Sequence, residues 1–386
     1  MRQRKILGVI THNDQGGAQE MLMRLFDGLS KKGYEVELWY LYKRRAISDT
    51  ILPSRFILEK EASKTIDYIR IVSRLARLLV LTRPTTVISF LPLANILTQT
   101  LAWVCWVPVR VASQRNPVQT YSRVMQFLDW YVGTCGSYTH NIMNSSDVSL
   151  SVSRYPWPYR CRTKIIQNGL DAIGGCAEPR ADVRTQLGLE AKDIALVSVG
   201  RLTKQKNLVF LVQILGRLKN FKLLLAGCGP EHARIAIEAD RMGVSHRVIF
   251  LGSLSQSATR RLLYAADIFA LPSLYEGHSN ALLEAMSAGK AIVTSNLPSH
   301  QETLDDGGLG AGISIPLTEP NRWIDILKQL GSSAEERDEL GRRAKRRSKY
   351  FTLDKMCSSF EELINFQNSE GSSSSNEEGE HRRLQA

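Results

Sequence analysis

The feature that most constrains the fold of this 386-residue chain is an alternation of short apolar runs with helical patterns, which occurs twice. The first series predicts strands at residues 5–11, 35–41, 86–91 and 108–113, and helices at 18–31, 65–81 and 95–106. After Asn168 and Gly169, the second series predicts strands at 195–199, 221–226, 248–251 and 268–271, and helices at 207–218, 231–242 and 256–265. Strands that alternate with helices in this way form parallel sheets covered by helices. The chain therefore predicts an α/β protein with two Rossmann-like domains.

The domain boundaries follow from the same pattern. A chain of this length exceeds what one hydrophobic core usually serves, so two domains of ordinary size are expected. We expect an N-terminal domain at residues 1–170, a second domain at 171–350 and a C-terminal helix within 351–367. Residues 368–386 are rich in Ser, Gly and Glu and cannot bury a core, so we expect a disordered tail.

The balance of charge predicts an acidic partner, because the net charge is +12 and the isoelectric point is about 9.5. Arg70, Arg74 and Arg77 recur at helical spacing on one face of the predicted helix 65–81. Such a face suits an anionic membrane surface, where each basic residue contributes roughly 1 kcal/mol. A solvated outer helix face is an equally open interpretation. No signature of a nucleic-acid-binding fold is present, so nucleic acid is not an expected partner.

The cysteines and apolar segments indicate a cytoplasmic protein. Six cysteines lack both a Cys-x-x-Cys pair and metal-ligand spacing, which is typical of reduced thiols. Residues 93–109 are apolar but short for a membrane span and interrupted by polar positions, so we expect a buried helix and strand there. The apolar run at the N-terminus is too short for a signal peptide and is better interpreted as the first strand. A peripheral position at the inner face of the plasma membrane remains open.

The most informative motif contains two glutamates, Glu276 and Glu284, where a strand pattern passes into a loop and then a helix. Gly277 allows a tight turn, and the N–H groups of residues 278–280 would open the helix as an anion site suited to phosphate. Glu284 could accept hydrogen bonds from a ribose, and Glu276 from sugar hydroxyls. Without further signals, both would be ordinary surface acids.

This motif resembles the Glu, seven residues, Glu motif of retaining glycosyltransferases of family 4, which have the GT-B fold. Residues 199–207, with the sequence Val-Gly-Arg-Leu-Thr-Lys-Gln-Lys-Asn, are similar to the Gly-Arg-Leu…Lys-Asn segment of that family. In the family, the Arg and the second Lys bind the nucleotide diphosphate. The resemblance therefore assigns this role to Arg201 and Lys206, which alone would be read as a solvated basic loop.

Three turns extend the resemblance over nearly all of residues 5–366. Gly16 and Gly17 are similar to the family's N-terminal Gly-Gly turn, which approaches the donor phosphates. Residues 166–171 resemble the hinge between the domains, and residues 225–231 resemble a Gly-x-Gly-Pro turn. Each turn alone is ordinary in an α/β protein. In the family's order, they imply the GT-B fold, in which two Rossmann-like domains face each other across a cleft and a C-terminal helix crosses back to the first domain.

The resemblance implies a hexosyltransferase that moves a sugar with retention from a nucleotide diphosphate sugar, with a UDP-linked hexose or N-acetylhexosamine as the expected donor. The acceptor is expected to be a hydroxyl of a glycolipid, a lipid-linked oligosaccharide or a polysaccharide precursor, as in lipopolysaccharide biosynthesis. Arg201 and Lys206 would stabilise the leaving diphosphate, and Glu276 would hold the donor sugar. The other expected donor-site residues are Gly16, Gly17, Gly200, Gly277, His278, Ser279, Asn280, Ala281 and Glu284. No metal site is evident, so neither a metal nor a further cofactor is expected.

Four positions depart from the family pattern, and Cys228 and Gln19, where acidic residues are common, do not alter the expected fold. Many members carry a histidine after the fifth strand, where this chain has Arg115 followed by Asn116. We expect this pair on the acceptor side, where Arg115 meets the acceptor or a phosphate. His278 replaces a common aromatic residue beside the donor site, and we expect a loop side chain without a catalytic role.

Two alternatives remain open. A GT-B epimerase of nucleotide sugars would use the same cleft without an acceptor, but it needs acid and base residues that the sequence does not place. A noncatalytic scaffold that binds sugar nucleotides would be expected to lose at least one of Glu276, Arg201 and Lys206, and all three are present.

Overall fold

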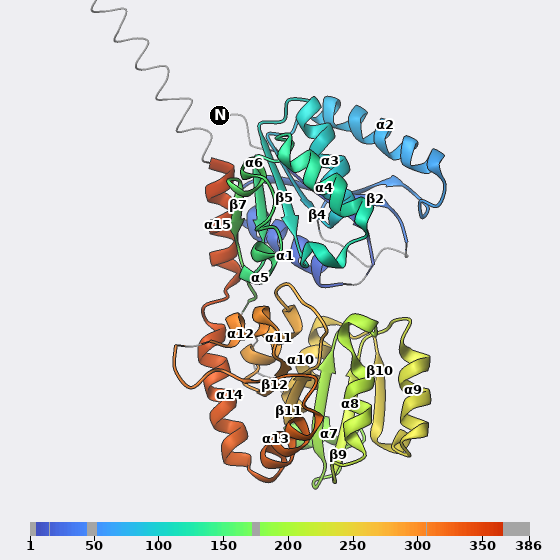
Figure 1. Cartoon of the computed structure of the whole chain (residues 1–386), viewed down its shortest axis with the longest axis vertical. Coiled ribbons are helices and arrows are strands. Elements are labelled where there is room, and N and C mark those ends of the chain that lie inside the picture. Colours follow the sequence, from blue (N-terminus) through green and yellow to red (C-terminus); the bar gives the residue numbers. More distant parts are fainter. Residues whose placement is uncertain (1–4, 15, 45–51, 172–177, 306, 366–386) are drawn as a thin grey trace, which may run out of the picture. The chain divides into compact units, whose positions relative to one another are not determined.

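The computed structural model describes residues 5–14, 16–44, 52–171, 178–305 and 307–365. The chain divides into two compact units, the first from Met1–Gly169 with Leu353–Ala386 and the second from Leu170–Thr352 (Figure 1). The sequence pattern had placed these divisions after residues 170 and 350. The expected tail at 368–386 and the thiol of Cys176 lie outside the described residues, and the other cysteines are free thiols.

The first unit contains, within its described residues, a seven-stranded parallel sheet with the strand order β3-β2-β1-β4-β5-β6-β7. Its strands are β1 (Lys5–His12), β2 (Glu35–Tyr42), β3 (Ser54–Leu58), β4 (Thr86–Phe90), β5 (Val109–Gln114), β6 (His140–Met143) and β7 (Thr163–Ile165). The central strands β1 and β4 are buried along almost their whole length. They read as continuous apolar runs because helices cover both faces of the sheet.

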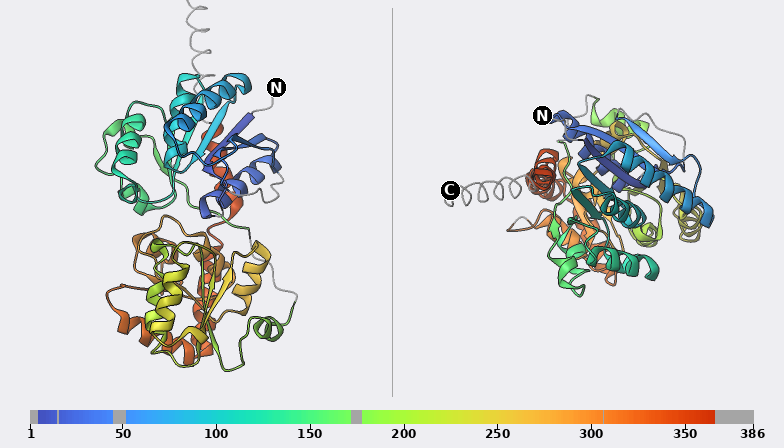
Figure 2. Two further views of the ribbon diagram at one scale, coloured as in Figure 1. Left: turned by 90° about the vertical axis from the view of Figure 1, so that its right-hand side faces the viewer. Right: turned by 90° about the horizontal axis from the view of Figure 1, so that it is seen from above.

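Helices of the first unit form a layer on each face of this sheet. The helices α2 (Thr65–Thr82), α3 (Pro92–Val104) and α4 (Arg123–Thr134) pack side by side as neighbours (Figure 1). On the other face, α1 (Gly17–Lys31) packs against α15 (Leu353–Asn365), the last described helix (Figure 2). Short helices at Val118–Thr120, Ser146–Leu150 and Trp157–Arg160 complete the unit.

The C-terminal helix returns to the first unit, as expected. A Cβ on Gly28 of α1 would overlap Sγ of Cys357, so the glycine permits the close approach of α15. Lys32 donates to Oε2 of Glu361 at 3.0 Å, and the hydroxyl of Tyr34 donates to Oε1 of the same residue at 2.9 Å. Packing and polar contacts thus join the last helix to α1.

The second unit contains, among its described residues, a six-stranded parallel sheet with the order β10-β9-β8-β11-β12-β13. Its strands are β8 (Ile194–Val199), β9 (Phe221–Ala226), β10 (Val248–Gly252), β11 (Ile268–Leu271), β12 (Ala291–Ser295) and β13 (Ile313–Ile315). Its helices are α7 (Arg180–Gln186), α8 (Leu208–Leu215), α9 (His232–Arg241), α10 (Gln256–Ala265), α11 (Asn280–Ser287), α12 (Pro298–Leu304), α13 (Pro320–Ser332) and α14 (Ala334–Ser348). Two single turns occupy Lys204–Lys206 and Ser245–Arg247.

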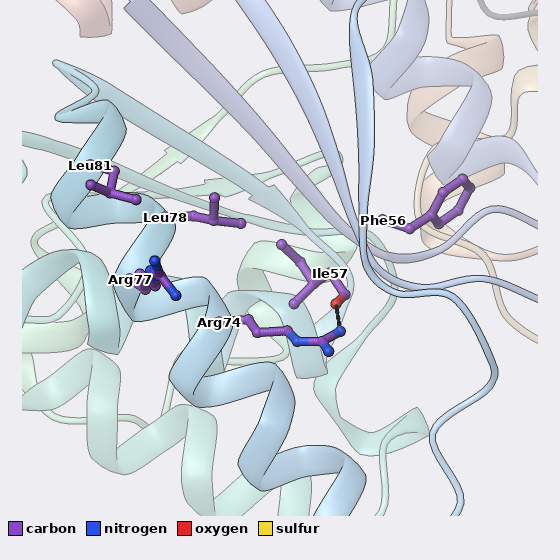
Figure 3. A pocket seen from close by; sticks show the side chains of 6 residues that line it. All are labelled: Phe56, Ile57, Arg74, Arg77, Leu78 and Leu81. Atoms are coloured by element: carbon purple, nitrogen blue, oxygen red, sulfur yellow. Dashed lines mark hydrogen bonds between the residues drawn. The ribbon is translucent and has the colours of Figure 1, made fainter.

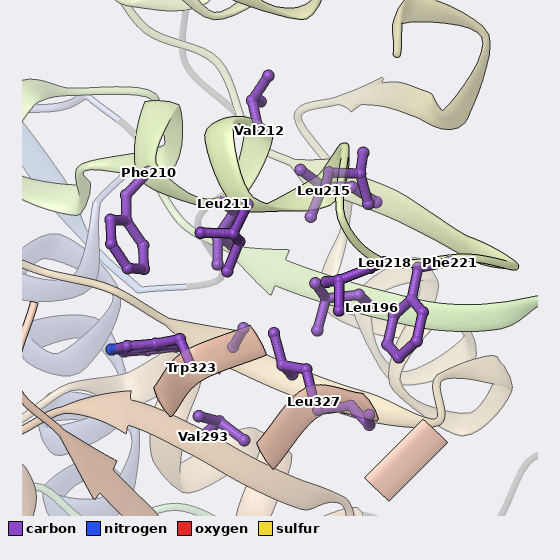
Figure 4. Close-up of a cluster of buried hydrophobic side chains, with 14 of the residues drawn as sticks. Leu196, Phe210, Leu211, Val212, Leu215, Leu218, Phe221, Val293, Trp323 and Leu327 are labelled. Atoms are coloured by element: carbon purple, nitrogen blue, oxygen red, sulfur yellow. The ribbon is translucent and has the colours of Figure 1, made fainter. Parts of the chain in front are cut away.

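One hydrophobic core joins α8 and α13 to the sheet of the second unit (Figure 4). Phe210 meets Trp323 edge to face, with ring centroids 5.2 Å apart, and both side chains are buried. Leu196 of β8 and Val293 of β12 belong to the same cluster. Burial of aromatic rings contributes strongly to the stability of such a core. The packing of α8 and α13 therefore stabilises the sheet whose loops carry the candidate site.

Helix α3 shows why residues 93–109 combine apolar and polar positions. Nδ2 of Asn95 donates to the carbonyl of Ser113 at 3.0 Å, and Nε2 of Gln99 donates to Oγ of Ser89 at 2.7 Å. The polar face of α3 is therefore buried against the sheet, whereas Trp103 and Val104 are exposed. In the part of the chain that the structure describes, no helix is both long enough and apolar enough to cross a bilayer.

A groove of about 350 Å³ lies between α2 and the edge strand β3 (Figure 3). It is lined by Phe56, Ile57, Arg74, Arg77, Leu78 and Leu81. Nη1 of Arg74 donates to the carbonyl of Ile57 at 3.0 Å, so this guanidinium is bonded to the edge strand. The three arginines expected on one face of α2 are all exposed, but Arg74 is bonded to β3 and Nη1 of Arg70 lies 3.8 Å from Oδ1 of Asp67.

Candidate functional site

The candidate site of the second unit begins where two neighbouring parallel strands end. The strand β8 pairs with β11, so their following loops emerge at the same edge of the sheet. The amide of Leu274 donates to the carbonyl of Gln205 at 2.8 Å, and Nε2 of Gln205 donates to the carbonyl of Tyr275 at 3.0 Å. These bonds fasten the two loops together, and ligands of open α/β sheets bind at such edges.

Lys206 and Glu276 meet between these loops. Nζ of Lys206 lies 2.5 Å from Oε1 of Glu276, and the side chains are only 14% and 8% exposed. Oγ of Ser273 donates to the same carboxylate oxygen at 2.8 Å. Burial would raise the pKa of Glu276, but the Lys206 and His300 side chains, with the hydrogen bonds from Lys206 and Ser273, hold that pKa below its usual value. The structure therefore brings two of the three predicted catalytic residues into one ion pair.

A buried polar network continues from Glu276 to a histidine that the sequence analysis missed. Oγ of Ser295 donates to the carbonyl of Ser273 at 2.7 Å, and Nδ1 of His300 donates to the carbonyl of Ser295 at 2.9 Å. Burial lowers the pKa of His300, although the Glu276 charge acts in the opposite direction. Within the described residues, Nε2 of His300 has no hydrogen-bond partner. The apolar run of β12 just before Ser295 was the signal that could have placed this segment at the same sheet edge.

Glycines determine how closely the loop of Arg201 and Lys206 approaches its neighbours. Gly200 has a φ of 145°, and a Cβ there would lie 3.0 Å from Cε of Lys206. Gly227 has a φ of 135°, and a Cβ there would overlap the carbonyl oxygen of Gly200. These backbone conformations favour glycine. The Gly-x-Gly turn therefore has a structural role beside the site, and Arg201 itself is exposed.

The segment after Glu276 opens α11 as expected, but with a shifted start. The helix begins at Asn280, and Oγ of Ser279 accepts from the amide of Leu282 at 3.5 Å as the N-cap. Gly277 and His278 therefore precede the helix. Ser279 and Asn280 are buried, whereas Ala281 and Glu284 are half-buried.

His278 lies in the loop before α11, as expected, and its side chain is buried. Its ring lies 5.1 Å from the ring of Phe351, and it is 5% exposed. A residue held in this way contributes to the shape of the loop between Glu276 and α11.

The remaining predicted residues lie in the first unit, at the carboxyl ends of its strands. Gly16 is the N-cap of α1 and has extended backbone, and Gly17 is the first helical residue. Arg115 and Asn116 follow β5 directly, and the carbonyl of Asn116 accepts from the hydroxyl of Tyr121 at 3.1 Å. Among the described residues, no group of three or more His, Cys, Asp or Glu side chains is placed to hold a metal ion.

Comparison with known proteins gives a family match inside the second unit. Residues 179–347 match the sequence model of the family described as Glycosyl transferases group 1. An uncharacterised glycosyltransferase of Methanocaldococcus jannaschii is 30% identical over 150 residues, which are 37% of this chain and 38% of that protein. The lipopolysaccharide core biosynthesis glycosyltransferase LpsE of Rhizobium meliloti is 29% identical over 174 residues, which are 45% of this chain and 49% of that protein. The chain thus matches less than half the length of these relatives.

Solved structures match the whole fold. Anabaena HepE, solved in complex with UDP and glucose, superposes with a TM-score of 0.82 at 16% identity, covering 94% of this chain and 100% of HepE. The structural neighbours are GT-B glycosyltransferases, and this chain has the same α/β architecture of two units with parallel sheets. At this level of identity, the likeness establishes the fold.

Proposed function

We propose that this protein is a retaining glycosyltransferase that uses a nucleotide diphosphate sugar, with a UDP-linked hexose or N-acetylhexosamine as the donor. The acceptor is a hydroxyl of a glycolipid, a lipid-linked oligosaccharide or a polysaccharide precursor. The observation that carries the proposal is the buried ion pair of Lys206 and Glu276 at the carboxyl ends of β8 and β11. The family match of residues 179–347 around this pair supports it, as do the UDP and glucose bound to HepE and the lipopolysaccharide role of LpsE.

The charges at this edge suit the departure of a nucleoside diphosphate. When the bond between the anomeric carbon and the diphosphate breaks, negative charge develops on the diphosphate oxygens. The ammonium of Lys206 and the exposed guanidinium of Arg201 would stabilise this charge together with the first amides of α11. These cations would supply the stabilisation without a metal ion. Glu276 would accept hydrogen bonds from the hydroxyls of the donor sugar, and Glu284 from the ribose.

We also propose that the acceptor is met at an anionic membrane surface, through the outer face of α2, α3 and α4. Large apolar side chains are exposed on these helices and just after α3, namely Ile66, Ile69, Val80, Leu81, Trp103, Val104, Trp106, Val124, Phe127 and Tyr131. The acidic residues in 65–134 are Asp67 and Asp129, and both are buried. Arg70, Arg77 and Arg123 are exposed. Aromatic and cationic side chains without exposed carboxylates match the chemistry of a bilayer with anionic headgroups.

The donor site is tested by incubating the full chain with UDP, GDP and ADP sugars in the presence of EDTA and measuring release of the nucleoside diphosphate. Release from one donor is expected for the wild type, with a loss of at least about 100-fold in Glu276→Ala and Arg201→Ala. Glu335→Ala, which removes an exposed carboxylate from the first turn of α14, is the control and should retain full activity. Release that requires a divalent metal would contradict the metal-independent mechanism.

The same assay separates the transferase from its two rivals. An epimerase would convert the donor sugar without releasing the diphosphate, and a scaffold would bind the donor without turnover. The NMR coupling constant of the anomeric proton in the product decides between retention and inversion. Binding without any chemistry, even with a membrane lipid extract present, would overturn the transferase proposal.

The membrane face is tested by flotation with vesicles of phosphatidylcholine alone or with phosphatidylglycerol added. Binding is expected only to the anionic vesicles and should fall in a Trp103→Ser and Phe127→Ser double variant. Leu309→Ser, which alters an exposed apolar residue in the second unit, is the control. Self-association in place of vesicle binding would assign the face to a second copy of the chain and overturn the membrane proposal.

A further inference from the structure

Two arginines with different surroundings lie near the two ends of β5, Arg110 within the strand and Arg115 just after it. Arg110, near its start, donates to backbone carbonyls of Val107 at 2.7 Å, Ser137 at 2.9 Å and Gly136 at 3.2 Å. Carbonyl oxygens carry partial negative charge and satisfy the fork of a guanidinium. Arg110 is therefore a structural residue that joins β5 to the turn before β6.

Arg115, directly after the same strand, is more deeply buried and lacks such partners. It is 8% exposed, and Nη2 donates to Oδ1 of Asn168 at 2.5 Å. Nη1 lies at 3.5 Å from Oγ of Ser113, and Cζ stacks 4.7 Å above the ring of Phe90. Within the described residues, Arg115 forms no ion pair with a carboxylate. All of its contacts are with neutral groups.

Burying the Arg115 guanidinium in this way lowers the stability of the folded protein. Moving a charged group out of water costs several kcal/mol unless an opposite charge or a full set of hydrogen bonds compensates. The two hydrogen bonds use one N–H of each terminal nitrogen, and a guanidinium has five N–H donors. Burial lowers the pKa of Arg115 to about 10, so the group keeps its charge at neutral pH.

The sheet edge around Arg115 presents further unused polar atoms. Nδ2 of Asn144 donates to the carbonyl of Arg115 at 3.3 Å, whereas Oδ1 of the same buried side chain has no partner among the described residues. Phe90 of β4 pairs with Ile10 of β1 on one side and with Ser113 of β5 on the other. Thr11 follows Ile10 and therefore lies at the same edge of the sheet, one position beyond Phe90. Oγ1 of Thr11 is also buried and has no hydrogen-bond partner in the described part of the chain.

Backbone conformation sets this edge apart as well. Leu91 follows Phe90 and has a φ of 77°, which is costly for a residue with a branched side chain. Such strain persists where the surrounding structure requires it and is found often at binding sites. It holds the turn from β4 into α3 directly beside the ring on which Arg115 stacks.

We propose that Arg115 is the binding residue for an anionic group, a phosphate or a carboxylate, carried by the acceptor. The inference rests on the proposed transferase function and narrows its acceptor class to anionic polyhydroxyl compounds. A planar guanidinium, held by Phe90 and Asn168, presents its remaining N–H groups to two oxygens of one anion. Acceptor hydroxyls donate to the unpartnered oxygens of Asn144 and Thr11.

The experiment uses the full chain with saturating UDP and measures the binding of small probes by calorimetry. Glucose is the neutral probe, glucose 6-phosphate and glucuronate carry the two candidate anions, and inorganic phosphate tests the anion alone. The wild type is expected to bind at least one anionic sugar about ten-fold more tightly than glucose or better. Arg115→Gln should abolish this preference, and Arg115→Lys should keep part of it as a point charge. Arg160→Gln, which removes an exposed arginine from the same unit, should change nothing.

Three results would overturn the inference. The first is a wild type that does not distinguish the anionic sugars from glucose, and the second is an Arg115→Gln variant that retains the preference while its thermal stability falls. A drop in UDP affinity in Arg115→Gln, with the probes unaffected, would assign the guanidinium to the donor. Failure of the proposed function would give a different result, because the wild type would then bind no UDP. If the wild type still preferred the anionic sugar in the absence of UDP, the Arg115 site would remain supported.

Discussion

The carboxyl edges of the two parallel sheets each carry a buried cation, but its surroundings are opposite. In the second unit, Lys206 is paired at 2.5 Å with Glu276, whose carboxylate also accepts from Ser273. In the first unit, Arg115 contacts the neutral side chains of Asn168 and Phe90. Both cations follow the end of a strand in a Rossmann-like sheet, so their position in the topology is comparable.

The difference teaches that a shared fold does not determine the electrostatics of its binding edge. The paired ammonium of Lys206 stabilises the loops after β8 and β11. It can also attract a ligand that carries more negative charge than one carboxylate. An unpaired guanidinium contributes little to the fold and gains most from a ligand that brings the missing charge. Removing Lys206 should therefore destabilise its unit clearly, whereas removing Arg115 should change the stability of its unit little.

The largest effect is expected from breaking the ion pair of the second unit. Lys206→Met and Glu276→Gln should each lower the unfolding free energy of this unit by about 3 kcal/mol, because each leaves the partner charge buried and unpaired. The double variant should lose less than the sum of the two. Hydrogen exchange of the slowest amides in β8 and β11 measures the change. Additive losses would show that the two charges are not coupled.

A smaller loss of unfolding free energy is expected at Gly227, where the backbone approaches the carbonyl of Gly200 closely. Gly227→Ala should cost about 2–3 kcal/mol, because the residue has a positive φ and the new Cβ would overlap the carbonyl of Gly200. Gly243→Ala is the matched control, with a φ of 66° and nothing within 4 Å of its Cβ, and should cost only about 1 kcal/mol. Chemical denaturation of the two variants gives both values, and equal losses would mean that the close approach is unimportant.

Acid should act on the two units through different groups. Burial lowers the pKa of His140 in β6 to about 4, with the charge of Lys164 acting in the same direction. Because the unfolded chain binds the proton near pH 6.5, stability of the first unit should fall by about 1–2 kcal/mol as the pH drops from 6.5 to 4.

The second unit should lose the contribution of Glu276 below about pH 4.5, since that carboxyl has a lowered pKa. Because burial also lowers the pKa of His300, this unit should in addition lose some stability as the pH drops below about 6.5. Hydrogen exchange at a series of pH values, corrected for the intrinsic rate, follows each unit separately. The variant His140→Gln should remove the loss between pH 6.5 and 4 in the first unit. An unchanged profile in this variant would exclude His140 as its cause.

The smallest effect on stability is expected at Arg115. Arg115→Met should change the unfolding free energy of the first unit by no more than about 1 kcal/mol in either direction, because an apolar chain of similar length replaces an uncompensated charge. Arg110→Met, on the same strand, should be clearly destabilising because its bonds to three carbonyls are lost. A large loss in Arg115→Met would mean that the guanidinium serves the fold, and the contrast between the two edges would then fail.

Much of the fold was predictable because strongly apolar strands and amphipathic helices leave a local pattern. The predicted strands at 221–226 and 268–271 agree with β9 and β11, and the predicted helix at 256–265 agrees with α10. Five strands were missed, namely β3, β6, β7, β12 and β13. The edge strands β3, β7 and β13 are short and partly exposed, whereas β6 and β12 are short but buried. Half-exposed short strands lack the continuous apolar run on which the prediction depends.

The candidate site was predictable only in part. Glu276 and Lys206 were found through a resemblance of motifs, and the structure brings them together. Ser273, Ser295 and His300 were missed, because no motif marks them and their importance arises from hydrogen bonds that join the loops after β11 and β12. The helix start expected at residues 278–280 was also imprecise, since Ser279 caps a helix that begins at Asn280.

The sequence by itself determined that this chain forms two parallel α/β sheets, because hydrophobic periodicity is a property of neighbouring residues. Only the tertiary structure decided which charges are compensated. The order of the strands places β8 beside β11 and so brings Lys206 to a carboxylate seventy residues away. The same kind of packing buries Arg115 among neutral groups. Electrostatic energy depends on distance in space and on burial, and neither can be read from spacing along the chain.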